Sequence, residues 1–263
     1  MEKALAASIA RRFGLAFDEA EVIGEGMNVL VHLRPAPVVA RVTRVAHLVR
    51  PVIELAGGVG LAKHLGDRAV PPSELIEPGP HVEGGRYVTF WTYRPGEKAS
   101  ASEAGAALRE FHDAAEPYRG PLRSFDPRPE ALRIADLVGG EPAEILRDAA
   151  ARLAPPMLPQ QAIHGDAHFG NVLAGGVWQD FDDACVGPRE WDLACMIHRW
   201  SVFGLLEGEM REALAAYGPH DREAVEALQP LVVLGLAAWG SLAPLIGESS
   251  PRTPERLAWL RRH

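Results

Sequence analysis

One short stretch of the chain places chemically active residues at fixed spacing around a tight turn. His164 and Asp166 stand at its start. Asn171 follows five residues after Asp166, and Asp180 lies nine residues beyond Asn171. Two short, mainly apolar runs, 172–174 and 177–179, and a central pair of glycines fill the gap between Asn171 and Asp180. This pattern is typical of two short antiparallel strands joined by a two-residue turn. The stretch therefore predicts a loop and a hairpin that bring its polar residues together.

A two-residue turn also predicts the register of the hairpin. It places Asn171 opposite Asp180, and directly opposed residues in antiparallel strands have Cβ atoms about 4.5–5.5 Å apart. An amide oxygen and a carboxylate at that separation suit Mg²⁺, which prefers hard oxygen ligands beside substrate phosphates. We therefore predict Asn171 and Asp180 as magnesium ligands. Asp166 reaches the same site as the base for an acceptor hydroxyl, so the pattern indicates phosphoryl transfer.

A competing interpretation treats His164, Asp166 and His168 as a zinc cluster, because alternate residues of this kind can bind zinc. It leaves Asn171 and Asp180 without a role. The phosphoryl-transfer interpretation accounts for all the polar residues of the stretch, and we prefer it for that reason.

Composition narrows the class of protein. The chain has 263 residues, of which 47% are hydrophobic and 24% charged, as in ordinary globular enzymes with room for two lobes around a cleft. Its net charge of −8 argues against a nucleic-acid partner and favours a cationic small substrate. Only two cysteines are present, which predicts a reducing, cytoplasmic location.

Two apolar segments have features of targeting or membrane elements, and neither fits one. Residues 1–13 form one apolar face with arginines at the end, which predicts an amphipathic helix and not a signal peptide. The run Leu231–Ile246 is interrupted by a proline and is shorter than the ~20 residues that cross a bilayer. We expect it to be a buried helix, and we expect no membrane partner.

The order of elements predicts two lobes. The first, residues 1–93, should be a small antiparallel sheet with one helix near 49–65, and the second, residues 94–263, should be mainly helical apart from the hairpin. The turn containing Gly24, Gly26 and Asn28 could offer backbone N–H groups to phosphates. The expected strands are Ala20–Ile23, Val29–Leu33, Val38–Val42, Leu75–Ile76 and Tyr87–Trp91.

Three segments together resemble the aminoglycoside phosphotransferase family: residues 164–171, Gln179–Asp183 and Gly187–Ala194. These are small-molecule kinases with the protein-kinase fold, so the resemblance implies an α+β two-lobe fold that binds ATP, or GTP, with Mg²⁺. It also implies that Asp166 is the catalytic aspartate. His164 would orient the catalytic loop, and Asp192 would brace it from the following helix.

The same resemblance assigns the nucleotide site. Arg41 stands where the family pattern has a phosphate-binding lysine, and Glu54 is the only acidic residue between Arg41 and Asp67, which makes it the default ion-pair partner. The segment around Glu54 carries several glycines, so this pair is the weakest part of the match. The interlobe segment, Trp91, Thr92 and Tyr93, would receive the nucleobase.

The acceptor stays open at this stage. An aminoglycoside or another antibiotic is the leading class by resemblance, and related kinases phosphorylate choline or homoserine. A binding protein without turnover is the main alternative, because Arg41 and Glu54 depart from the family pattern. A protein kinase is disfavoured, because the segment from Asp180 to Trp191 is too short for a regulatory activation loop.

Overall fold

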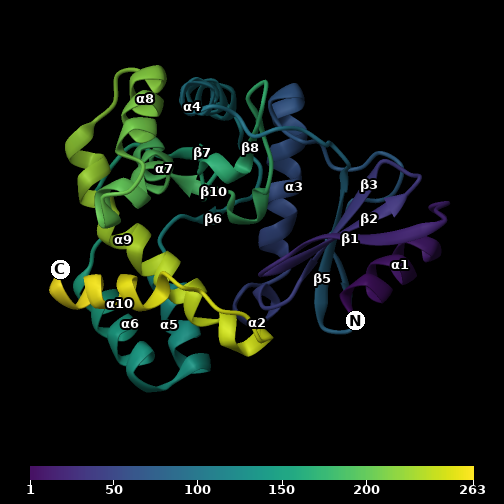
Figure 1. Ribbon diagram of the computed structural model, residues 1–263, viewed down its shortest axis with the longest axis horizontal. Coiled ribbons are helices and arrows are strands. Elements are labelled where there is room, and N and C mark those ends of the chain that lie inside the picture. The colour runs from purple at the N-terminus through teal and green to yellow at the C-terminus, as the bar shows by residue number, and fades with distance from the viewer.

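The β-branched runs near the N-terminus form one antiparallel sheet in the computed structural model, which describes residues 1–263. Its strands follow the spatial order β1-β2-β3-β5-β4, on the right of Figure 1. Helix α1 (Glu2–Arg12) packs on this sheet, and apolar side chains of both elements form a separate core. The strands are β1 (Glu19–Glu25), β2 (Asn28–Arg34), β3 (Val38–Thr43), β4 (His81–Glu83) and β5 (Arg86–Thr92).

The chain leaves the sheet after β3 and forms two helices that pack elsewhere. Val45 and Val49, at the start and end of α2 (Ala46–Val49), lie in one core of the helical lobe. Three residues of α3 (Ile53–Leu65), namely Leu61, Ala62 and Leu65, lie in the other core of that lobe. The short helix η1 (Gly66–Arg68) then returns the chain toward the sheet. In Figure 1 α3 stands between the two lobes.

The larger lobe is mainly helical. Helix α4 begins with a capping box, in which Ser100 and Glu103 satisfy each other's backbone N–H groups. Its helices are α4 (Ala101–Ala115), α5 (Arg128–Val138), α6 (Gly140–Arg152), α7 (Arg189–Phe203), α8 (Glu207–Tyr217), α9 (Arg222–Ser241) and α10 (Thr253–Arg262), with short η2 (Phe169–Asn171), η3 (Phe181–Asp183) and η4 (Ala243–Ile246).

Two small sheets of the larger lobe position the predicted catalytic stretch. One has the order β6-β10-β7, and the other is the β8–β9 hairpin. The loop after β7 and the turn before β10 therefore start from neighbouring, hydrogen-bonded strands. The strands are β6 (Arg123–Ser124), β7 (Gln161–Ile163), β8 (Val172–Leu173), β9 (Val177–Trp178) and β10 (Cys185–Gly187).

The α+β fold with a small sheet lobe and a larger helical lobe is confirmed, and two local predictions are wrong. Leu75–Ile76 forms no strand, and the edge of the sheet is instead β4, which pairs with β5. The helix expected over 49–65 begins only at Ile53 and is preceded by the separate short helix α2, which ends at Val49 because Pro51 cannot continue its backbone hydrogen bonds.

Helix α9 is the apolar segment that the sequence predicted to be buried. It is long and apolar enough to span a membrane by length and composition alone. In this fold, however, Val232, Val233 and Leu234 lie in the two cores of the helical lobe. The helix begins at Arg222 and continues through Pro230, so the proline lies inside it.

Candidate active site

The loop between β7 and η2 carries the predicted base. Asp166 has a side chain that is 32% exposed, and its Oδ2 lies 3.5 Å from Nε2 of His168. His164 is fully buried and its Nε2 contacts the Gln179 carbonyl oxygen at 3.0 Å. His164 therefore ties the loop to the hairpin, while Asp166 is left accessible. The chain contains no group of three His, Cys, Asp or Glu side chains that could hold a metal ion, so the zinc interpretation is wrong.

Asp192 on α7 holds this loop from behind. Its Oδ2 accepts the His164 backbone N–H and its Oδ1 accepts that of Gly165, both at 2.8 Å. The same Oδ2 lies 3.0 Å from Nε2 of His112, whose other ring nitrogen contacts the Tyr217 hydroxyl at 2.9 Å. Asp192 and His112 are fully buried. Because a buried carboxylate with several charge-assisted hydrogen bonds has little freedom, this network fixes the loop that carries Asp166.

The hairpin register is shifted by one residue from the prediction. Leu173 faces Val177 and Val172 faces Trp178, so the turn has three residues and not two. Gly175 and Gly176 both have positive φ. Ala174 joins them in the turn, so β8 ends one residue earlier than predicted. The pairing of Asn171 with Asp180 is therefore wrong.

Asn171 is aligned with Gln179 instead, whose N–H donates to the Asn171 carbonyl at 2.9 Å. Asp180 nevertheless reaches the same cavity as Asn171. Asn171 Nδ2 donates to the Asp166 carbonyl at 3.0 Å, and no protein group donates to Asn171 Oδ1. Asp180 has φ 67° and ψ 71°, a left-handed conformation that non-glycine residues rarely adopt outside functional sites. The free amide oxygen and the carboxylate form a hard oxygen donor set that fits Mg²⁺.

Arg41 joins the small lobe to this turn. Its Nη2 lies 2.6 Å from Asp180 Oδ1, and its Nε lies 2.7 Å from Asp182 Oδ2. Asp182 also accepts a hydrogen bond from Asn28 Nδ2 at 3.0 Å. Burial raises the pKa of Asp182 above its ordinary value in spite of the neighbouring guanidinium. The Nη1 group of Arg41 makes no protein hydrogen bond and remains available to an anion.

The predicted partner of Arg41 is wrong. Glu54 forms no ion pair, because the face of α3 that packs against the turn at Phe181 carries glycines and not acids. A Cβ at Gly58 would lie 2.1 Å from the Phe181 carbonyl oxygen, and one at Gly57 would lie 2.5 Å from the Pro121 carbonyl oxygen. The helix packs so closely that no side chain fits at these positions. The acid that Arg41 needs comes from the turn after Asp180 instead.

A cavity of about 310 Å³ lies beside Asp180 on the interlobe side. Trp91, Thr92 and Tyr93 line it, together with Arg41, Arg94, Asn171 and Asp180. The N–H groups of Thr92 and Tyr93 already donate to the Pro71 and Pro37 carbonyls, at 3.0 and 2.8 Å. The backbone N–H of Arg94 makes no backbone hydrogen bond, so it is the donor that this segment leaves free.

The other predicted phosphate-side residues lie apart from this cavity. Gly24 belongs to β1, at a register irregularity, and does not line it. Gly26 accepts a hydrogen bond from Arg44 through its carbonyl, at 3.2 Å. Asn28 contacts Asp182 and lines the neighbouring cavity. Of the three, only Asn28 touches the cluster around Asp180.

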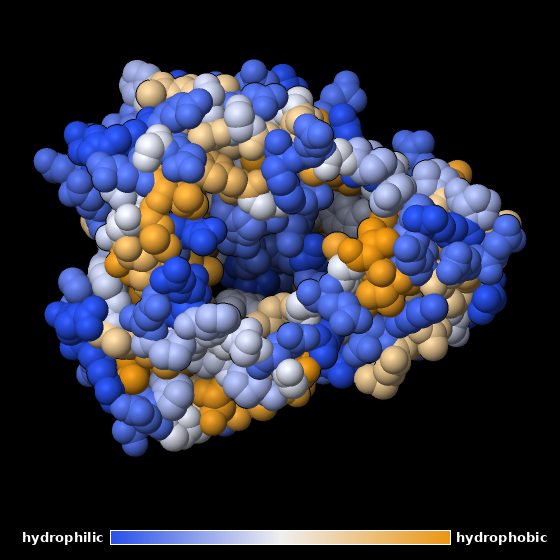
Figure 2. All heavy atoms as spheres, in the orientation of Figure 1, coloured by the Kyte–Doolittle hydropathy of each residue, from blue (hydrophilic) through white to orange (hydrophobic).

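A second cavity, of about 220 Å³, lies on the other side of Arg41 and Asp180 and contains Asp166. Figure 2 shows the hollow between the lobes, with hydrophilic side chains on its floor and hydrophobic ones at its rims. Trp191, Trp239 and Leu236 contribute its apolar wall. The two cavities thus meet at Arg41 and Asp180, which line both.

The polar wall of this second cavity is an arginine-carboxylate cluster that sequence reasoning missed. Arg50 contacts both carboxylate oxygens of Glu130, at 2.5 and 2.9 Å, and Asp183 Oδ1 at 2.6 Å. Arg123 Nη2 contacts the same Asp183 oxygen at 2.9 Å. Burial alone would raise the pKa of Asp183, but the Arg50 and Arg123 guanidiniums hold it well below its ordinary value. Arg50 and Glu130 are 80 residues apart and share no motif, so no spacing could reveal the pair.

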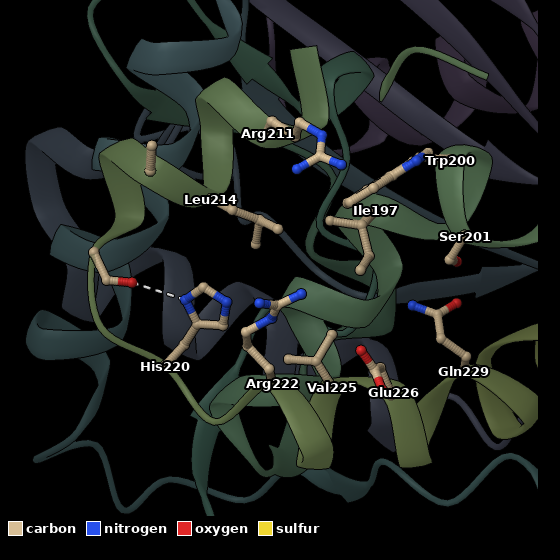
Figure 3. Close-up of a pocket in the computed structure, with 12 residues that line it drawn as sticks. Ile197, Trp200, Ser201, Arg211, Leu214, His220, Arg222, Val225, Glu226 and Gln229 are labelled. Carbon is tan, nitrogen blue, oxygen red and sulfur yellow. Dashed lines mark hydrogen bonds between the residues drawn. The ribbon is translucent and has the colours of Figure 1, made fainter. Parts of the chain in front are cut away.

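A larger cavity, of about 640 Å³, lies away from the catalytic loop between α7, α8 and α9 (Figure 3). Ile197, Leu214 and Val225 form its apolar wall. The Arg211 guanidinium lies 5.0 Å from the centre of the Trp200 ring at its edge. None of the predicted site residues lines this cavity.

The fold and the buried loop network define a phosphotransferase of the protein-kinase-like class. The sequence profile of the phosphotransferase enzyme family matches residues 24–228 of this chain, and the chain belongs to that family. A search among curated proteins finds no match.

Solved structures of small-molecule kinases share the fold. Choline kinase LicA from Streptococcus pneumoniae superimposes with a TM-score of 0.71 at 15% identity, over 100% of this chain and 98% of that one. A microcompartment-associated aminopropanol kinase gives 0.65 at 17%, over 97% and 94%. Aminoglycoside 2'-phosphotransferase-IIIa, solved as a GDP complex, gives 0.62 at 16%, over 100% and 98%.

Proposed function

We propose that this protein is a magnesium-dependent kinase that transfers the γ-phosphoryl group of ATP to a hydroxyl group of a small molecule. The observation that carries the proposal is the junction of two cavities at Arg41 and Asp180, with Asp166 in one and the interlobe segment in the other. A nucleotide in the interlobe cavity would direct its terminal phosphate toward this junction. An acceptor in the other cavity would meet it beside Asp166.

The roles of the residues follow from their contacts. Asp166 accepts the proton of the acceptor hydroxyl, because it is the accessible carboxylate without an arginine partner. Arg41 offers its free Nη1 to the phosphates and neutralises charge as the phosphoryl group moves. Asn171 Oδ1 and Asp180 would hold Mg²⁺, which would neutralise the charge of the nucleotide phosphates. Asp192 keeps the loop in place, so positioning supplies much of the acceleration.

Structural neighbours support a nucleotide in the interlobe cavity. LicA has been solved with AMP, and a spectinomycin phosphotransferase with ADP and spectinomycin. The GDP complex of the aminoglycoside enzyme makes GTP the alternative donor. A cytoplasmic location and a reducing environment stay part of the proposal, on the basis of the two unpaired cysteines.

A second candidate is a ligand-binding protein that has lost turnover. The observation that favours it is that Asp180 and Asp182 both already pair with Arg41, while Glu54 on α3 does not. Such a protein would bind ATP or an acceptor without releasing ADP.

One experiment separates these candidates. The purified protein is incubated with labelled ATP or GTP and Mg²⁺ and with aminoglycosides, other amine-bearing antibiotics, choline, homoserine, uncharged alcohols and a generic protein. Label transfer to a small molecule supports the kinase proposal. Transfer only to protein would replace it with a protein kinase, and nucleotide binding without any transfer would replace it with the binding protein.

A further inference from the structure

The cavity beside Asp166 contains a complete recognition site for a cation, and a residue of the chain already fills it. The Arg50 guanidinium lies 4.4 Å from the centre of the Trp239 ring. Its edge makes paired contacts to Glu130 and a further contact to Asp183. Trp239 Nε1 in turn donates to Glu130 Oε2 at 2.8 Å, which fixes the ring and the carboxylate relative to each other.

An aromatic face flanked by carboxylates is the chemistry by which proteins bind organic cations. Here the side chain of Arg50 is 2% exposed and comes from the loop after α2, whereas Glu130 and Trp239 belong to α5 and α9. The guanidinium thus already engages the Trp239 ring and the Glu130 and Asp183 carboxylates. Burial of both partners makes this arrangement expensive to open, since separation would leave unpaired charges in the interior.

All but one of the other carboxylates of the cavity also contact an arginine. Asp180 and Asp182 both bind Arg41, and Asp183 binds Arg50 and Arg123. Asp166 alone has no arginine, and it faces His168. The cavity is lined by the carboxylates Glu130, Asp166, Asp180, Asp182 and Asp183 and by the guanidiniums Arg41, Arg50 and Arg123.

We propose that Arg50 is a specificity residue that occupies the cation site of the acceptor cavity, so that this kinase selects small alcohols without a positive charge. This inference rests on the proposed function for the identity of the cavity. It departs from the cationic acceptor that the net charge of −8 suggested, because every carboxylate of the cavity except Asp166 already contacts a guanidinium. The volume of about 220 Å³ and the wall of Trp191, Leu236 and Trp239 fit a compact molecule with an apolar part.

Matched pairs of ligands test the inference on the wild-type protein. Choline and neohexyl alcohol have the same shape, but a quaternary carbon replaces the charged nitrogen in the alcohol. Aminocyclohexanol and cyclohexanediol form a second pair, in which a hydroxyl replaces the ammonium group. Affinity is measured by calorimetric titration with and without Mg²⁺ and ATP, and ADP release is measured in parallel. We expect the uncharged member of a pair to bind about tenfold or more tightly than its cationic partner.

Substitution of Arg50 should reverse this preference. Arg50→Met removes the guanidinium and leaves Trp239, Glu130 and Asp183 for a ligand, so choline affinity should rise by about tenfold or more. Arg44→Met is the matched control, because Arg44 contacts Glu248 and does not line the cavity. If Arg50→Met does not fold, the wild-type pairs still decide the matter, and Arg50→Lys should keep the preference for uncharged ligands.

The outcomes separate the inference from the proposed function. Tighter binding of choline or aminocyclohexanol to the wild type overturns the inference, as does an Arg50→Met variant that folds but keeps the wild-type preference. Binding of no member of either pair overturns it too, since a cavity that selects against charge must admit an uncharged ligand. Failure to bind or hydrolyse ATP would overturn the proposed function alone, because the titrations without nucleotide still report the charge preference.

Discussion

Asp182 Oδ2 lies 2.7 Å from the Nε atom of Arg41, and so forms the ion pair that was expected of Glu54. The same arginine binds Asp180 through Nη2 at 2.6 Å. One turn of the large lobe therefore provides both the candidate metal ligand and the acid that orients Arg41, the proposed phosphate-binding residue. Any change in the position of this turn moves both groups together.

Arg41 is the first residue to test. Arg41→Ala should raise the KM for ATP and slow transfer, because it removes the guanidinium that contacts Asp180 where the two cavities meet. Arg41→Lys keeps the charge but not the bidentate geometry, so it should retain partial activity. Steady-state kinetics with varied ATP measure both effects. Unchanged kinetics in both variants would mean that the phosphates are held elsewhere.

Asp166→Asn tests the base. The change should lower kcat by roughly 10²–10⁴, since an amide cannot accept the acceptor proton. Nucleotide affinity should stay close to that of the wild type, because Asp166 does not line the interlobe cavity. Calorimetric titration with ATP and the rate of product formation measure the two quantities. Near-normal turnover would remove Asp166 from the mechanism.

The candidate metal ligands should differ in importance. Asp180→Ala should abolish the Mg²⁺ dependence of nucleotide binding, while Asn171→Ala should weaken it less, because a carboxylate contributes more than a neutral amide oxygen. Titrations with ATP at several Mg²⁺ concentrations compare them. An equal or larger loss in the Asn171 variant would contradict this order.

Gly58 tests the close packing of α3. Gly58→Ala should lower the melting temperature, because its Cβ would meet the Phe181 carbonyl oxygen at 2.1 Å, even though alanine favours helix by about 0.5–1 kcal/mol over glycine. Gly208→Ala is the matched control. Gly208 lies in α8 with no atom within 4 Å of a Cβ, so that change should leave the melting temperature equal or slightly higher. Thermal unfolding of the two variants beside the wild type gives the comparison, and equal behaviour would refute the packing argument.

His198 should make stability depend on acid pH. Burial and the neighbouring Arg256 lower the pKa of His198 from 6.5 to about 3. The unfolded chain therefore binds a proton below about pH 6.5 that the folded protein refuses, so stability falls as the pH drops from 6.5 toward 3. This residue adds at most about 1.4 kcal/mol per pH unit to the slope. Urea unfolding between neutral pH and pH of about 4 should show a smaller slope in His198→Gln than in the wild type, and identical slopes would exclude His198 as the cause.

The parts of the site that lie close together in the sequence could be predicted. Residues 164–180 form one loop and hairpin, so their spacing carried the positions of Asp166, Asn171 and Asp180. The strands around Arg41 also follow from their β-branched pattern. The register of the hairpin was wrong by one residue, because two adjacent glycines allow either a two-residue or a three-residue turn.

The contacts that depend on tertiary packing could not be predicted. Glu54 was assigned to Arg41 because it was the only acid in the segment, but its position on α3 is set by glycines that press the helix onto Phe181. Arg50 pairs with Glu130 across 80 residues, and an arginine after a short helix has no local signature of burial. The one local signal of these contacts is the pair of acids that follows Asp180, since two extra carboxylates in an enclosed turn require cations nearby.

The course of the chain between the cores has a mechanical consequence. After β3 the chain leaves the sheet, and Val45, Val49 and Leu61 pack into the two cores of the helical lobe. The chain then returns to the sheet, where β5 pairs with β3. A cut near Tyr93 would therefore strip the helical lobe of apolar side chains that precede the cut. The core of the sheet lobe lies wholly before the cut, whereas the helical lobe has no finished interior without residues 45–65. The helical lobe should therefore not fold as a separate fragment, and its unfolding should be coupled to that of the segment between β3 and β5.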